Sequence, residues 1–180
     1  MPKIYLSPSL QEWNPYVDGG NEEYYMNLVA DAMEPYLRAS GIEFKRNSPE
    51  MTLRQAIADS NAGNYDLHLA IHSNASGEGS AGKNRGVEVY YYPTSAKGQE
   101  FADILATNYS DLYPNPEKVR TIPTTSLGEL RLTRAPASLI EVAYHDNIED
   151  ARFIRDNINE IAKNLSKSVA ETLGVPFVEP

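Results

Sequence analysis

Short apolar runs alternate with helical patterns along the whole 180-residue chain, and this alternation is what most constrains the fold. The runs typical of buried strands lie at residues 4–6, 42–45, 65–72, 87–92 and 138–143. Apolar residues recur at helical spacing between them, over residues 21–41, 53–61, 99–112 and 158–173. The pattern predicts the α/β class, a single domain over residues 1–180 with a mostly parallel, twisted sheet and helices on both faces.

Composition excludes several classes of function. The chain carries 25 acidic against 16 basic residues, a net charge of −9, which is the opposite of a nucleic-acid binder. No apolar stretch approaches the roughly 18 residues that would span a bilayer, so we expect no integral membrane protein. The absence of cysteine excludes disulfides, thiolate metal sites and cysteine nucleophiles. No basic segment precedes a long apolar one, so we expect no signal peptide.

Polar residues gather where the predicted strands end. Residues 7–11 follow the first strand, and His72 closes the central one. Glu141 lies inside the last apolar strand, and Glu23 opens the first helix. Because ligands of such sheets collect outside the carboxyl ends of the strands, we expect these side chains to converge at one edge.

Glu141 has two interpretations. A carboxylate among apolar neighbours is costly to bury unpaired, so it needs a cation, a hydrogen-bond network or a solvated cleft. An ion pair with Arg131 or Arg134 is one interpretation. The other is a general base whose pKa is raised by partial burial.

The histidines are also ambiguous when each is taken alone. A single histidine at a strand end is more often a structural residue than a ligand. Together with Glu23 and Glu141, however, His72 forms the combination that hydrolytic zinc sites use. His68 lies four residues earlier on the same strand face, roughly 13 Å away and too far to share a metal. We therefore predict that His68 is a half-buried structural residue.

Four segments, in order along nearly the whole chain, carry a family resemblance: residues 23–28 (EYYMNL), 71–75 (IHSNA), 86–91 (GVEVYY) and 139–151 (LIEVAYHDNIEDA). Together they resemble the zinc-dependent N-acetylmuramoyl-L-alanine amidases, cell-wall hydrolases of bacteria and of phages, where they act as endolysins. The resemblance implies that Glu23 and His72 bind zinc and that Glu141 is catalytic. It also implies peptidoglycan as the substrate, cut between N-acetylmuramic acid and the first L-Ala of the stem peptide.

Two loops, residues 73–85 and 114–131, would flank a groove for glycan and peptide. Tyr90, Tyr91 and Tyr92 offer ring faces for sugar contacts, but ordinary strand packing is the preferred interpretation of this run.

The first strand departs from the family pattern. The family usually has Asp-Pro-Gly-His-Gly there, whereas residues 7–11 read SPSLQ, so Leu10 stands where a histidine ligand is expected. Gln11 offers an amide oxygen as a third, unusual ligand. Other candidates, if the loops bring them round, are Glu22, Glu12 and His145.

This departure leaves three options for the site: a rearranged zinc site, a different metal, or a site that has lost both metal and activity. The alternatives to an amidase are therefore an inactive peptidoglycan- or partner-binding domain on the same fold, and a zinc peptidase.

Overall fold

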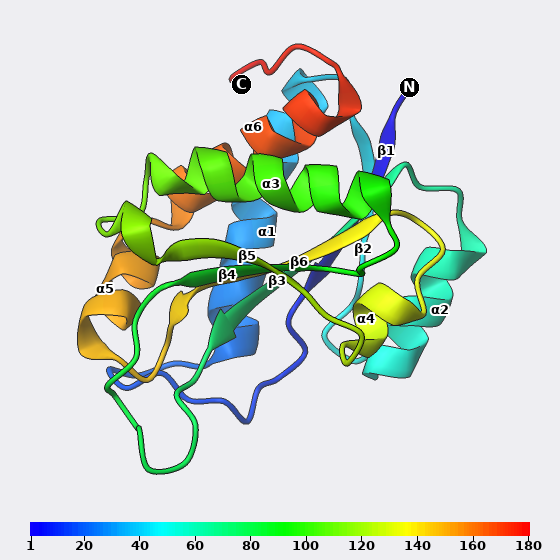
Figure 1. Cartoon of the computed structure of the whole chain (residues 1–180). Coiled ribbons are helices and arrows are strands. Elements are labelled where there is room, and N and C mark those ends of the chain that lie inside the picture. Colours follow the sequence, from blue (N-terminus) through cyan, green and yellow to red (C-terminus); the bar gives the residue numbers. More distant parts are fainter.

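A six-stranded sheet forms the centre of the computed structural model, which describes all 180 residues (Figure 1). The strands are Lys3–Pro8 (β1), Glu43–Arg46 (β2), Leu67–Asn74 (β3), Val87–Tyr91 (β4), Val119–Pro123 (β5) and Ala137–Tyr144 (β6). Their order across the sheet is β2-β1-β3-β6-β4-β5. All neighbouring pairs are parallel except β4 and β6, which are antiparallel. The predicted α/β class with a mostly parallel sheet is confirmed.

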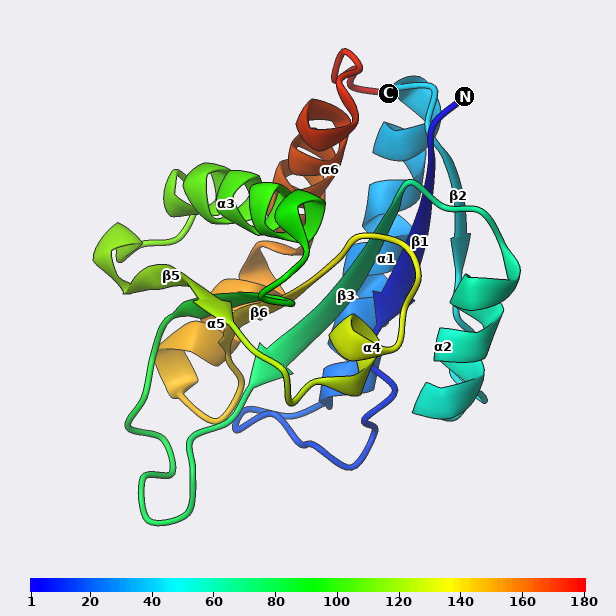
Figure 2. The same cartoon turned by 45° about the vertical axis from the view of Figure 1, so that its right-hand side comes forward.

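Helices cover both faces of this sheet. They are Glu22–Ala39 (α1), Leu53–Ala62 (α2), Ala96–Ser110 (α3), Gly128–Arg131 (α4), Ile148–Asp156 (α5) and Ile158–Leu173 (α6), with a short 3₁₀ turn at Pro116–Lys118. Helices α1, α3, α5 and α6 lie on one face, and α2 and α4 lie on the other (Figures 1 and 2). None of the helices combines the length and the apolar character that crossing a bilayer requires.

The beginning of α1 matters most for the site. Asn21 caps this helix by accepting a hydrogen bond from the Tyr24 amide, and acidic residues occupy the first turn, where the helix dipole favours them. The buried face continues through Met26, Val29 and Met33. Pro35 lies inside the last turns without ending the helix, as the continuing apolar spacing predicts.

The two faces of the sheet are packed very differently. A cluster of 32 buried residues fills the side of α1, α3, α5 and α6, whereas four residues form the cluster on the opposite side: Ala70, Leu130, Ala137 and Leu139. Side chains alternate between faces along a strand, so His68 and His72 share the thinly covered face with Ala70. Polar side chains are therefore concentrated on the face that α2 and α4 cover.

Strand β5 and helices α4 and α5 were absent from the expected pattern. Strand β5 is an edge strand with few apolar residues, and α4 has only four residues, too few to show a helical period. The expected C-terminal helix is α6, and the unexpected α5 precedes it, separated from it by a break at Asn157.

Candidate functional site

Three ionisable residues face one another across adjacent strands. His72 on β3 is the register partner of Glu141 on β6, and Glu141 is the partner of Glu88 on β4. Register partners project to the same face of a sheet. The sheet therefore brings His72 and Glu141 together, as the sequence predicts, and adds Glu88 beside them.

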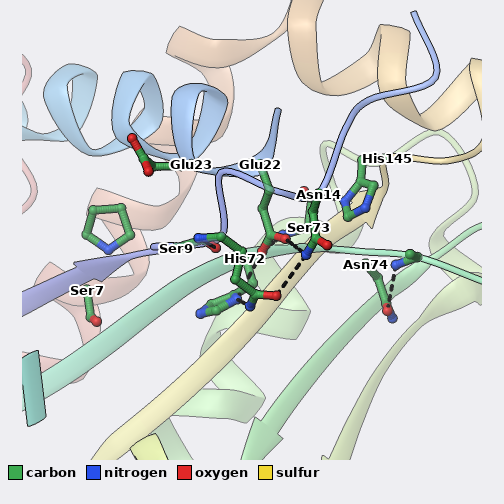
Figure 3. Close-up of polar contacts among 12 residues, drawn as sticks. Ser7, Ser9, Asn14, Glu22, Glu23, His72, Ser73, Asn74 and His145 are labelled. Carbon is green, nitrogen blue, oxygen red and sulfur yellow. Dashed lines mark hydrogen bonds and ion pairs between the residues drawn. The ribbon is translucent and has the colours of Figure 1, made fainter. Parts of the chain in front are cut away.

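Glu22 is the carboxylate that meets His72. Its side chain is buried, and its Oε1 lies 3.0 Å from Nδ1 of His72 (Figure 3). The same carboxylate accepts hydrogen bonds from the Ser73 amide at 3.3 Å and from Nδ2 of Asn14 at 2.8 Å. Burial opposes ionisation of Glu22, but the hydrogen bonds from His72 and Asn14 outweigh it and lower the pKa of this carboxyl.

Gln11 belongs to the same group of side chains. Its Nε2 lies 3.4 Å from Nδ1 of His72, and its Oε1 accepts a 2.8 Å hydrogen bond from Nδ2 of Asn14. Asn14 thus holds the side chains of Gln11 and Glu22 in place at once. Leu10, which stands where the family has a histidine, lines the adjoining pocket.

Glu23 is not part of this group, contrary to the expectation that it lies beside His72. Figure 3 shows its carboxylate pointing away from Glu22 and His72. It lines a separate groove together with Glu12 and Asn27. Burial and the nearby acidic side chains raise its pKa.

Glu141 carries an unsatisfied carboxylate oxygen. Its Oε2 is buried and has no hydrogen-bond partner in the protein. Burial, with smaller contributions from Glu22 and Glu88, raises its pKa to about 7, against the opposing charge of His72. No ion pair reaches it, because Arg131 bonds the carbonyl of Thr125 and Arg134 that of Asn61. The ion-pair interpretation of Glu141 is therefore wrong.

Sequence reasoning missed Glu129. This buried residue on α4 places Oε1 2.9 Å from Nε2 of His68 and Oε2 3.8 Å from Nε2 of His72. Burial opposes its charge, but the hydrogen bonds with the two histidines lower its pKa. Burial also opposes a charge on His72, yet Glu129 and Glu22 raise the pKa of this imidazole well above its usual value.

His68 is structural, as predicted, but it is fully buried rather than half-buried. Its Nδ1 bonds the hydroxyl of Ser60 at 2.9 Å, while its Nε2 meets Glu129. It therefore joins α2 to α4 beneath the site. His145 is structural too, since its Nδ1 bonds the hydroxyl of Ser73 and its ring stacks on Tyr16.

A pocket of about 280 Å³ opens beside these side chains. Polar groups of Gln11, His72, Glu129 and Glu141 reach it, and apolar side chains complete its wall: Leu10, Trp13, Leu53, Leu127 and Leu139. Of the two loops expected to flank a groove, only residues 114–131 contribute to this wall.

The tyrosine run packs as strand residues, which confirms the preferred interpretation. Tyr91 is buried in the large core, and Tyr90 and Tyr92 pack against the small cluster.

The side chains that meet at Nδ1 of His72 include two of the usual kinds of zinc ligand, an imidazole and a carboxylate. No three His, Cys, Asp or Glu side chains in the structure could hold a metal ion by themselves. Gln11, the third ligand that the sequence predicts, lies beside His72 and Glu22. The Glu22 oxygen meets Nδ1 of His72 directly at 3.0 Å, and the Gln11 atom nearest to Nδ1 is its amide nitrogen, at 3.4 Å. Exchanging the oxygen and nitrogen of the Gln11 amide would turn its oxygen toward His72, but it would also remove the hydrogen bond from Asn14.

Comparison with known proteins places this arrangement in a family context. The family model described as N-acetylmuramoyl-L-alanine amidase matches residues 12–171. A search of curated proteins finds no match.

Solved structures share the fold. The catalytic domain of CwlV, an N-acetylmuramoyl-L-alanine amidase from Bacillus (Paenibacillus) polymyxa var. colistinus, superposes with a TM-score of 0.84 at 19% identity, over 98% of this chain and 100% of that one. Ami1 from Mycobacterium smegmatis gives 0.81 at 15% identity, over 96% and 97%. The catalytic domain of the CD27L endolysin, which targets Clostridia difficile, gives 0.77 at 22% identity, over 95% and 98%.

Proposed function

This chain belongs to the N-acetylmuramoyl-L-alanine amidase family, and we propose that it hydrolyses the amide between N-acetylmuramic acid and the L-Ala of the stem peptide in peptidoglycan. One observation carries the proposal. Glu141, whose Oε2 has no hydrogen-bond partner, lines the same pocket as His72 and Gln11. A proton acceptor and two of the three proposed metal donors thus line one cavity.

Glu141 is the general base in this proposal. Its Oε2 accepts a proton from the attacking water and then donates a proton to the nitrogen of L-Ala as the carbon–nitrogen bond breaks. A pKa of about 7 suits both halves of this exchange near neutral pH. The products are a free lactyl carboxylate on the glycan and a free amino group on the peptide.

His72, Glu22 and Gln11 would hold a zinc ion through Nδ1, Oε1 and the amide oxygen. When bound, zinc supplies Lewis-acid polarisation of the amide carbonyl and makes water a stronger nucleophile. Glu129 places Oε2 3.8 Å from Nε2 of His72, so its charge favours a proton on Nε2 and leaves Nδ1 for the metal. Asn14 orients the Glu22 carboxylate through its 2.8 Å hydrogen bond to Oε2.

Digestion of purified peptidoglycan by the zinc-loaded protein tests the proposal. We expect newly freed amino groups on L-Ala, detected by labelling and by mass spectrometry of the released peptides. Glu141→Gln should lower the rate by about 10²–10⁴-fold, because a positioned general base contributes that much. Its zinc content should remain unchanged, because Glu141 is not a ligand in the proposal.

The outcome also separates the competing functions. Cleavage only at peptide bonds within the stem would indicate a peptidase. A fully zinc-loaded protein that sediments with peptidoglycan but releases nothing would be a binding domain. The observation that favours this second candidate is Gln11, a weaker zinc ligand than the histidine it replaces.

A further inference from the structure

The only tryptophan of the chain is exposed at the mouth of the candidate active site. Trp13 is 70% exposed and lines the same pocket as Gln11, His72 and Glu141. Burying a large apolar side chain stabilises a fold by about 2–3 kcal/mol. Because Trp13 is exposed, the fold does not gain this stabilisation. Packing within the chain therefore does not account for its position.

The backbone that carries Trp13 is held on both sides. The Asn14 amide donates to the carbonyl of Gln11 at 3.3 Å, and the Glu22 amide donates to the carbonyl of Asn14 at 3.0 Å. The side chains of Gln11 and Asn14 are bonded to each other and to the group around His72. Trp13 is thus an exposed ring on a fixed turn, which reduces the entropy lost when a ligand stacks on it.

A second exposed apolar side chain faces the same opening. Leu53, at the start of α2, is 49% exposed and lines the pocket, as do Leu10 and Leu127. The other exposed large apolar side chains line none of its wall: Met1, Val17, Tyr24, Leu132, Ile148 and Val178. Exposed apolar surface gathered at a polar cavity is typical of a ligand-binding site.

We propose that Trp13 and Leu53 form a sugar subsite, in which the indole stacks on the apolar face of an N-acetylmuramic acid ring. The inference rests on the proposed function. A pyranose ring presents a flat face of C–H groups, and its hydroxyls remain in water when this face covers an exposed indole, a ring suited to such half-wet contacts. A short lactyl group joins this sugar directly to the scissile carbonyl. With that carbonyl beside Glu141, the ring must therefore lie at the pocket mouth.

Because Trp13 is the only tryptophan, its fluorescence reports this contact without any turnover. We expect peptide-free glycan strands of alternating N-acetylglucosamine and N-acetylmuramic acid to produce a saturable blue shift of the emission. Free stem peptide beginning with L-Ala should produce none. Tyr24→Ala is the matched control, since Tyr24 is an exposed aromatic residue on a neighbouring groove, and it should keep the glycan response.

Kinetics with soluble glycan-peptide fragments provide a second measurement. Trp13→Ala should raise KM about tenfold with kcat changed less than about twofold, because the ring adds uniform binding to ground and transition states. Trp13→Phe should recover most of the loss, and Tyr24→Ala should behave as wild type. Circular dichroism spectra of the variants should match, since Trp13 supports no packing.

Two results would overturn the inference. One is a fluorescence response to the stem peptide alone, which would assign Trp13 to the peptide side. The other is a protein that releases L-Ala amino groups but shows two null results. Its fluorescence does not change when glycan is added, and the Trp13→Ala substitution does not change its KM. If no amino groups are released at all, the proposed hydrolysis fails, and the glycan titration still decides whether sugar binds at Trp13.

Discussion

Glu22 and Glu23 are neighbours in sequence, but about 100° of helical rotation separates their side chains. Glu22 shares the buried face of α1 with Met26, Val29 and Met33, whereas Glu23 is turned toward a different groove. The short motif Glu-x-x-x-Asn selects Glu23, because it counts backward from Asn27. The helical phase of the apolar residues selects Glu22 and was available in the sequence.

We expect this rotation to decide which residue binds metal. Glu22→Gln should weaken zinc binding by at least about 100-fold, more than is typical for residues that only support a ligand. Glu23→Gln should leave the affinity within about twofold. Competition with a chromophoric chelator measures both dissociation constants. Gln11→Ala against Glu12→Ala is a second matched pair, and equal affinities within either pair would contradict the assignment.

The role of Glu129 could not be predicted from the sequence. It is 61 residues from His68 and 57 from His72 along the chain, on a helix of four residues that no periodicity reveals. Only the fold brings it between the two imidazoles. His72 and Glu141, by contrast, were found because each interrupts or closes a strongly apolar strand.

At the level of elements, Asp150 fastens several segments together. Its buried carboxylate accepts hydrogen bonds from Nε of Arg85, the amide of Gly86, the hydroxyl of Tyr113 and the amide of Tyr144. The beginning of α5 is thereby tied to the start of β4, the segment after α3 and the end of β6. No neutral side chain of similar size can accept all four of these hydrogen bonds, so none can replace the carboxylate.

Asp150→Asn should therefore destabilise the fold by about 3 kcal/mol, because it leaves Arg85 without its buried partner and places an amide group against donors. Glu149→Gln is the control. Glu149 pairs with the same Arg85, but it is 65% exposed, so its loss should cost less than about 0.5 kcal/mol. Urea unfolding monitored by circular dichroism gives both free energies. Similar values for the two variants would refute the distinction.

The elements that the sequence predicted were those with long apolar patterns. The central strand and α1 keep a clear period, and the capped start of α1 follows from Asn21 and its acidic neighbours. Strand β5 could not be recognised, because an edge strand needs no continuous apolar run. The antiparallel direction of β4 was also unpredictable, since a strand's composition does not record its direction.

At the scale of the molecule, two buried carboxyl groups, Glu88 and Glu141, change the free energy of unfolding in opposite directions as pH rises. Burial opposes ionisation of Glu88, but hydrogen bonds from Tyr90, Arg120 and Tyr144 outweigh it and lower its pKa. Ionised Glu88 therefore stabilises the fold above about pH 4.5, and this contribution is lost as pH falls through its lower folded pKa. The raised pKa of Glu141 acts in the opposite direction, so stability is lost as pH rises from about 4.5 to about 7.

We expect the melting temperature of the metal-free protein to fall both as pH decreases below about 4.5 and as pH increases from about 4.5 to about 7. Glu88→Gln should flatten the loss below about pH 4.5, and Glu141→Gln should flatten the decline between about pH 4.5 and 7. Melting temperatures of the chelator-treated proteins from pH 3 to 8 measure both slopes. Parallel curves for the wild type and the two variants would show that these carboxyl groups do not control the pH dependence.

The reversed direction of β4 has a consequence for how such a domain can change. Strand β3 ends, and β4 begins, at the same edge of the sheet, so the segment between them never crosses the molecule. The amides of Ser76 and Gly82 are tied to Asp146, which anchors the segment near both of its ends. Residues inserted between these anchors would lengthen the loop between β3 and β4 without changing the order or direction of any strand. Such insertions would leave the pocket beside Glu141 intact, because this segment lines none of its wall.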